Sequence, residues 1–137
     1  MLRVQVRGVE TARRIFDRLE EALDPEQIAE DSARIILRNT RDRFQDEIDP
    51  DGQPWIPSRR VRLRGGKTLL DTGRMFSGLE LVQSGLAEYT VTTDAPYATF
   101  HQTGTRFMPK RQFLGVSQQD ETDITQSIVD KIVRSFR

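Results

Sequence analysis

The segment DPEQIAEDSARIILRNTRDRFQ, residues 24–45, decides the fold. Asp24 is a favourable N-cap and Pro25 stands where a first-turn proline is tolerated, so a helix begins here. The apolar residues of this helix recur at helical spacing along one main stripe, formed by Ala29, Ala33, Ile36, Leu37, Thr40 and Phe44. Ile28 and Ile35 add a second apolar edge. A helix with two apolar edges is expected to pack against more than one neighbour.

The segments on either side of this helix carry different patterns. Residues 9–23 confine their apolar side chains to one arc, which predicts a strongly amphipathic helix. Leu2, Val4 and Val6 alternate with polar residues up to Gly8, which indicates a half-buried strand. Residues 46–67 hold Asp-Pro-Asp-Gly, two further prolines and Gly-Gly, so we expect a long loop without regular structure, held at one end by Trp55.

The C-terminal half contains shorter elements. We expect a short helix capped by Asp71 or Thr72 and ending at Ser77, a β-hairpin over 79–93 with its turn at Ser84-Gly85, helical turns over 95–102 closed by Gly104, and a last helix beginning at Ser117 or Asp120. Residues 1–137 therefore predict one α+β domain. Its small, mainly antiparallel sheet carries two N-terminal helices and a C-terminal helix packed on it, with a long loop at 46–67.

Composition restricts the chemistry. The chain has 21 basic and 21 acidic residues, so no net field steers it onto nucleic acid. It has no cysteine, which excludes disulfides, thiolate zinc sites and cysteine nucleophiles, and a reducing cytosol is the expected compartment. No apolar run approaches the length of a membrane span, and no cofactor, metal site or membrane contact is expected.

Three motifs that could carry chemistry are incomplete. His101 is the single histidine, and no Gly-x-Ser-x-Gly nucleophile elbow accompanies it, so we interpret it as structural rather than catalytic. Gly66-Lys67-Thr68 ends like a phosphate-binding loop, but Arg60 stands where the first glycine is needed. Residues 46–52 are acidic, but a proline interrupts the alternation of a calcium loop. We predict that the protein is not an enzyme.

The basic run is the candidate contact site, for another subunit or for DNA. It consists of Arg59, Arg60, Arg62, Arg64 and Lys67. Such a loop neutralises phosphates without reading sequence, but it contains no aromatic residue that would stack on bases. The alternative interpretation is a solvated loop whose charges pair with acidic neighbours on the same or an adjacent subunit.

Four motifs in order give the second half a family resemblance. These are Asp-Pro-Asp-Gly-Gln-Pro-Trp (49–55), Leu-Leu-Asp-Thr-Gly-Arg-Met (69–75), Ala-Pro-Tyr-Ala-Thr-Phe-His-Gln-Thr-Gly-Thr (95–105) and Met-Pro-Lys-Arg-Gln-Phe-Leu-Gly (108–115). The series resembles the phage virion morphogenesis, or tail-completion, family of contractile-tailed phages and prophages. Gln112 replaces the proline of the family's Arg-Pro-Phe-Leu-Gly. The matching residues that we interpret mainly as fold-forming are Trp55, Asp71, Thr72, Gly73, Arg74, Tyr97, His101, Gln102, Gly104, Pro109, Arg111, Phe113 and Leu114.

The resemblance implies a structural role in tail completion or head–tail joining. Proteins of this kind form rings, commonly hexameric, at the head-proximal end of the tail, where their partners are the tail tube or sheath and the neck proteins. DNA would only pass through such a ring. The protein would be in the host cytoplasm during assembly and then in the tail or neck of the virion.

Other roles stay open at this stage. One is a capsid-side head–tail connector or a minor tail protein, and another is a nucleic-acid-binding module that uses residues 59–67. Within a ring, the acidic segment Asp46–Asp51 and the basic segment Arg59–Lys67 could pair between copies, because a ring joins two different surfaces.

Overall fold

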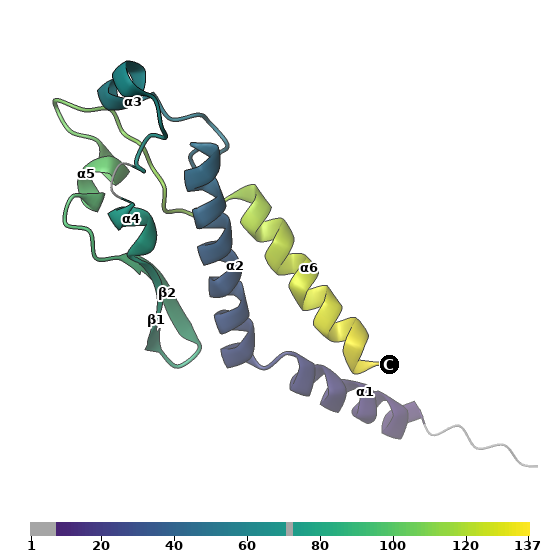
Figure 1. The fold of residues 1–137 in the computed structure, drawn as a ribbon. Helices are drawn as coiled ribbons and strands as arrows, with labels where there is room; N and C mark the ends of the chain where they lie inside the picture. The colour runs from purple at the N-terminus through teal and green to yellow at the C-terminus, as the bar shows by residue number, and fades with distance from the viewer. Residues whose placement is uncertain (1–7, 71–72) are drawn as a thin grey trace, which may run out of the picture.

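Helix α2 (Pro25–Asp46) is the central element of the computed structural model, which describes residues 8–70 and 73–137 (Figure 1). Asp24 caps it by accepting a hydrogen bond from the Glu26 N–H at 3.2 Å. It ends at Glu47, which has a left-handed backbone with φ of 57°. The predicted helix and its cap are confirmed, and so is the expectation of several neighbours, since α2 packs against the sheet and against α6 (Gln118–Ser135).

The sheet is a hairpin of β1 (Leu79–Gly85) and β2 (Glu88–Thr93), paired antiparallel from Leu79↔Thr93 to Gly85↔Glu88 with an irregularity after Gln83. Its two-residue turn is Leu86-Ala87, with Ala87 at φ 53°, so the turn lies two residues after the predicted one. The turn lies later because β1 extends through Gly85, which still pairs with Glu88. Short helices α4 (Arg74–Ser77) and α5 (Ala98–Thr103) lie at the base of the hairpin (Figure 1).

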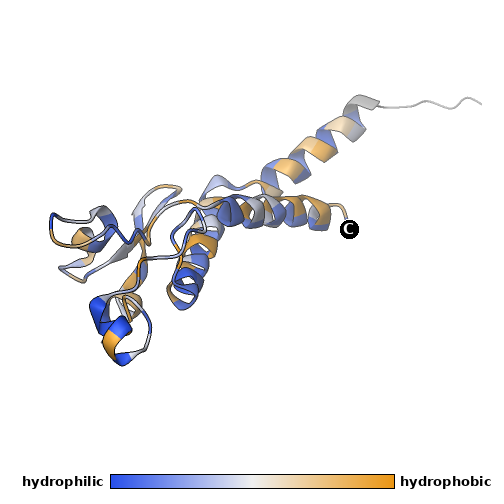
Figure 2. Ribbon diagram, turned by 90° about the horizontal axis from the view of Figure 1, so that it is seen from above, coloured by the Kyte–Doolittle hydropathy of each residue, from blue (hydrophilic) through white to orange (hydrophobic). Residues whose placement is uncertain are grey.

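The α+β class is confirmed, and each long helix packs against a different neighbour. α2 covers the hairpin, whereas α6 lies along another side of α2 and α1 (Gly8–Ala22) packs against α6 (Figures 1 and 2). The predicted amphipathic helix over 9–23 is α1. The predicted strand of Leu2, Val4 and Val6 lies outside the described residues.

A buried polar cluster joins α6 to α2. Asp120 is fully buried and accepts hydrogen bonds from Asn39 Nδ2 at 2.8 Å and Arg43 NH1 at 3.4 Å. Asp120 and Ser117 also form a reciprocal capping box, which confirms Ser117 as the start of the last helix. The same side chain therefore begins α6 and fixes it to α2.

The hydrophobic core is centred on Phe44 of α2. Its ring makes edge contacts with Trp55 and Phe76, at centroid distances of 5.5 and 5.9 Å, and a tilted contact with Phe113 at 5.4 Å. Met75 and Leu79 complete the buried cluster. Phe113 is 69 positions from Phe44 in the sequence, so the core joins the long α2 helix to the loops of the C-terminal half.

One expectation for the short segments is wrong. The 46–67 segment is not without regular structure, because α3 (Arg59–Arg64) forms inside it. Gly73 is the N-cap of α4 and makes no side-chain cap bond, and the predicted caps Asp71 and Thr72 lie outside the described residues. Gly73 has φ of 73°, a left-handed conformation that glycine adopts without steric cost.

Candidate functional site

The basic run folds into helix α3 because a capping residue stands at each of its ends. Ser58 caps the first turn, with its Oγ accepting from the Val61 N–H at 3.3 Å, and Gly65 ends the helix at φ 77°. Arg59, Arg60, Arg62 and Arg64 therefore surround a single short helix instead of following an extended loop.

Two of the five predicted basic residues are used to hold α3 in place. Arg60 NH2 donates to the Lys67 carbonyl at 2.7 Å, and Lys67 Nζ donates to the Gln45 carbonyl at the end of α2 at 2.6 Å. The buried Thr68 adds a bond from its N–H to Glu47 Oε1 at 2.6 Å. The three remaining arginines, Arg59, Arg62 and Arg64, are exposed and form no ion pair with any described residue.

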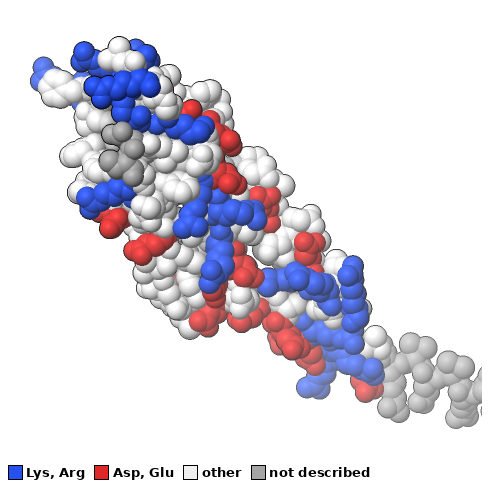
Figure 3. Space-filling model, viewed as in Figure 1, with Lys and Arg blue, Asp and Glu red and all other residues white. Residues whose placement is uncertain are grey.

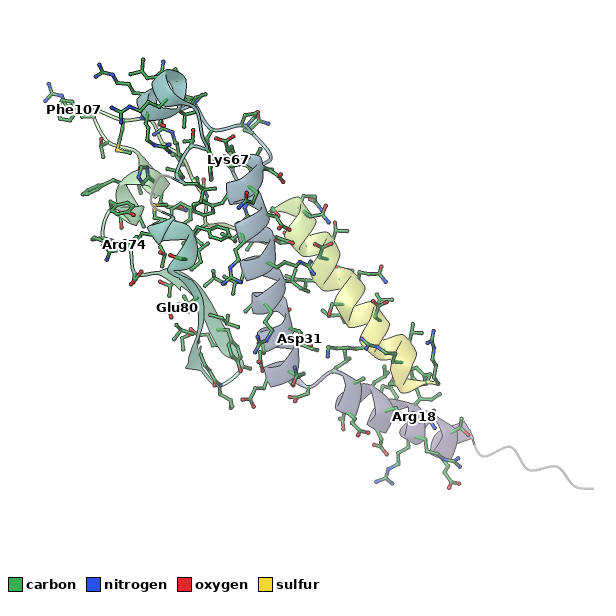
Figure 4. The ribbon with its side chains drawn as sticks, viewed as in Figure 1. Arg18, Asp31, Lys67, Arg74, Glu80 and Phe107 are labelled. Carbon is green, nitrogen blue, oxygen red and sulfur yellow. The ribbon has the colours of Figure 1, made fainter. Side chains whose placement is uncertain are left out.

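A second segment, distant in sequence, lies beside α3. The backbone of Arg111 donates to the His101 carbonyl at 2.7 Å, and its Nε donates to the Ile56 carbonyl at 2.7 Å, which ties residues 104–111 to the residues preceding α3. This loop contributes Arg106, Lys110 and the 91% exposed Phe107. Figure 4 shows Phe107 pointing outward next to α3.

The two segments form one surface, which we call the basic tip. Its charged members are Arg59, Arg62, Arg64, Arg106 and Lys110, and its exposed apolar members are Ile56, Leu63 and Phe107. Basic side chains gather over α3 at this end of the molecule in Figure 3. The Arg106 guanidinium lies 5.6 Å from the centre of the Phe107 ring. Sequence reasoning missed Arg106, Phe107 and Lys110 because only the fold brings residues 104–111 beside α3.

A hollow of about 410 Å³ opens beneath the basic tip. It is lined by Ser58, Arg60, Leu69, Met75, Tyr97, His101 and Arg111. Burial, followed by the charge of Arg111, lowers the pKa of His101, so its imidazole is neutral near pH 7. Burial, followed by the charge of Arg62, lowers the pKa of Arg111. Positive charge therefore dominates this hollow.

His101 and the acidic turn, the two sites considered for catalysis or metal binding, have the following surroundings among the described residues. His101 stacks edge-on against Tyr97 at a centroid distance of 6.0 Å, and its Nδ1 has no hydrogen-bond partner there. In residues 8–70 and 73–137 no group of three His, Asp or Glu side chains could hold a metal ion. The acidic Asp49 instead accepts hydrogen bonds from the Asp51 and Gln53 N–H groups of its own turn, at 2.9 and 2.8 Å.

Several of the motif residues form contacts inside the fold. Gln102 Oε1 accepts from the N–H groups of Phe113 and Leu114, both at 3.1 Å, and its Nε2 donates to the Leu114 carbonyl at 2.6 Å. Trp55 Nε1 donates to the Gln112 carbonyl at 2.8 Å. Phe100, which belongs to the same motif, is 54% exposed and so contributes little to the packing of α5.

The remaining motif residues lie in three kinds of place. Gly104 has φ 75°, and a Cβ there would come within 2.8 Å of the Lys110 N atom. Phe113 is buried in the core, with Tyr97 and Leu114 packed against its edge. Arg74 and Pro109 are exposed. The close approach at Gly104 shapes the loop that presents Phe107.

Known proteins resemble the chain over most of its length. A model of the phage virion morphogenesis family matches residues 8–133. Mu-like prophage FluMu G protein 1 of Haemophilus influenzae is 26% identical over 129 residues, covering 83% of this chain and 84% of that protein. Mu-like prophage FluMu G protein 2 of the same organism is 29% identical over 105 residues, covering 71% and 73%. No solved structure matches the chain significantly.

The family match confirms the resemblance predicted from the four motifs. It extends beyond them into α1, α2 and α6. Within residues 8–70 and 73–137, none of the helices combines the length and the apolar composition of a membrane span.

Proposed function

Because this chain belongs to the phage virion morphogenesis family, we propose that it is a structural subunit of tail completion, joining tail to head as part of a ring at the head-proximal end of the tail. A role in phage morphogenesis follows from the family and from the Mu-like prophage relatives. The tail position and the ring are our proposal. Its work is protein–protein contact rather than catalysis.

The basic tip is the observation that carries this proposal. It combines three arginines that have no acidic partner among the described residues with apolar side chains exposed beside them, including Phe107. Arginine and aromatic residues are enriched at the energetic centres of protein interfaces. A solvated surface gains nothing from exposing Ile56, Leu63 and Phe107 together, whereas an interface buries them.

The partner of the basic tip has to be acidic. In a ring one surface meets a different surface of the next copy. The last residue of α2 and the turn that follows it offer exposed carboxylates at Asp46 and Asp51. Within one subunit this turn already adjoins the basic segment through Lys67 and Thr68. We therefore propose that the unpaired Arg59, Arg62 and Arg64 reach the acidic turn of a neighbouring copy.

A matched pair of triple variants tests the contact. In the test variant, Arg59→Gln, Arg62→Gln and Arg64→Gln remove three charges from the basic tip. In the control, Arg14→Gln, Arg34→Gln and Arg38→Gln remove three charges whose side chains are 71, 64 and 62% exposed and are paired with carboxylates of their own chain. Exposed ion pairs contribute little to stability, so both variants should fold. We expect the test variant alone to reduce the oligomer mass in light scattering and to fail to complement a prophage that lacks the gene.

Electron microscopy of particles made without the protein separates the possible positions. Overlong tails, or tails without heads, support tail completion. Empty heads without tails would instead assign the protein to the capsid-side connector, and normal particles would overturn a role in assembly.

Phe107 gives a second candidate function some support. An exposed aromatic ring beside Arg106 and the α3 arginines is the combination that binds single-stranded nucleic acid, by stacking and by phosphate contact. The balanced net charge argues against it. DNA binding that survives about 0.2 M salt and is lost in Phe107→Ala would favour this function, because phosphate contacts alone weaken steeply with salt.

A further inference from the structure

Helix α1 projects from the end of the molecule opposite the basic tip (Figure 1). Its principal contact within the chain is with α6. The apolar stripe includes Ala12, Ile15, Phe16 and Leu19, yet Ile15 is 43% and Phe16 is 66% exposed. Within the described part of the chain, the most strongly amphipathic helix therefore leaves Ile15 and Phe16 of its apolar face exposed.

The end of α6 nearest α1 presents a second apolar row. Val129, Val133 and Phe136 are spaced by four and three residues, so they share one face of the helix, and all three are exposed. In Figure 2 the end of α6 lies near the part of α1 that adjoins α2, and α1 runs away from α6 toward its N-terminal end. Exposed apolar side chains therefore occur on both helices at this end of the molecule.

The charges beside the α1 stripe identify the partner. Arg13 and Glu20 are seven residues apart, close to two helical turns, so both lie along the same edge of the stripe. Both are exposed, and neither forms an ion pair with a described residue. If two α1 helices pair antiparallel about a centre close to Phe16, Arg13 of each lies alongside Glu20 of the other. A parallel pairing would place like charges together.

We propose that two copies of this chain associate through an antiparallel pairing of their α1 helices. The apolar stripes are buried against each other, and two Arg13–Glu20 ion pairs fix the direction. Such a two-fold contact closes on itself and yields a dimer, so a larger ring needs a second contact at another surface. The proposal concerns the free protein in solution and does not depend on the tail role.

Charge reversal tests the pairing in the full-length protein. The measurement is the molar mass of the purified chain by sedimentation or light scattering over a concentration series. The wild type should reach twice the monomer mass or an even multiple of it. Arg13→Glu and Glu20→Arg should each weaken association roughly tenfold, because two attractive exposed pairs become repulsive. The double variant, with both changes, should regain wild-type association since the pairs are attractive again.

Two further variants separate the pairing from general damage. Arg14→Glu reverses an exposed charge on the other side of α1, away from the edge that holds Arg13 and Glu20, and should leave the mass unchanged. Phe16→Glu should weaken association by at least about a hundredfold, because the ring is lost from both copies. Circular dichroism should show the helical content retained in each variant.

The outcomes decide the proposal separately from the proposed function. A wild type that stays monomeric at all concentrations, or a double variant no better than the single ones, overturns the α1 pairing. Neither result bears on whether particles made without the protein lack heads or tails.

Discussion

Asp120→Ala should cost the folded chain roughly 3–5 kcal/mol, the usual loss when one partner of a buried ion pair is removed. Asp120 is 0% exposed, and its carboxylate accepts from Arg43 NH1 and Asn39 Nδ2 and from the Ser117 N–H. Truncation leaves the 5% exposed Arg43 without its counterion. It also removes half of the capping box at the start of α6.

The measurement is urea unfolding followed by circular dichroism, with thermal unfolding as a second readout. A loss of this size should lower the melting temperature by roughly 10–20 °C in a domain of this length. Asp120→Asn keeps the shape and an acceptor oxygen, so it should fall between the wild type and Asp120→Ala. Asp130→Ala is the control on the same helix, because Asp130 is exposed and its carboxylate accepts from Gln126 of α6 rather than from the buried cluster. If Asp120→Ala costs under about 1 kcal/mol, the cluster does not join α6 to α2 in the way described.

Three further changes test other parts of the fold. Trp55→Phe keeps the ring against Phe44 but removes the hydrogen bond to the Gln112 carbonyl, and should cost about 1 kcal/mol, whereas Trp55→Ala should cost about 3–5 kcal/mol in the same urea assay. Gly104→Ala should destabilise by more than about 1 kcal/mol, because φ is 75° and the new Cβ would meet the Lys110 backbone; a neutral result would refute the close approach. Burial lowers the pKa of His101 in the folded state, whereas the unfolded chain keeps the ordinary histidine pKa of about 6.5. The unfolded chain therefore takes up this proton first as the pH is lowered, and the free energy of unfolding decreases as the pH drops. His101→Gln should therefore lose less stability than the wild type between about pH 8 and about pH 5.5 in urea titrations, and equal losses would contradict the shift.

The molecule places its two candidate contact surfaces at opposite ends (Figures 1 and 3). The basic tip is built on α3 and residues 104–111, and the apolar end on α1 and α6. α2 and α6 connect the two ends, and the Asn39–Arg43–Asp120 cluster fixes these helices together. This arrangement suits a subunit that has to bind two neighbours at once.

Local signals were enough to predict the long helices. The caps at Asp24 and Ser117 act within three residues of each helix start, and periodicity acts within one helix, so both are readable without the fold. Gly104 was predicted to close the helical turns over 95–102, and it is the C-cap of α5, with φ of 75°. α3 was not predicted, because its caps, Ser58 and Gly65, are set among prolines and glycines that indicate a loop.

The candidate contact surface was predictable only in part. The arginines of residues 59–64 stand out in the sequence, but the sequence does not show that Arg60 and Lys67 are used to hold α3 against α2. Nor does it show that Phe107 lies beside them. Arg111 makes that connection by bonding to the carbonyl of Ile56, 55 residues away.

The sequence by itself therefore determined the α+β class, the helices α1, α2 and α6, the lack of thiol chemistry and the family resemblance. Each of these depends on residue identity or on spacing within a few turns. The tertiary structure alone decided that Asp120 is buried against Arg43, that residues 104–111 complete the basic tip, and that Ile15 and Phe16 of the α1 stripe are exposed among the described residues. These are relations between segments far apart in the chain, and only packing around Phe44 sets their distances.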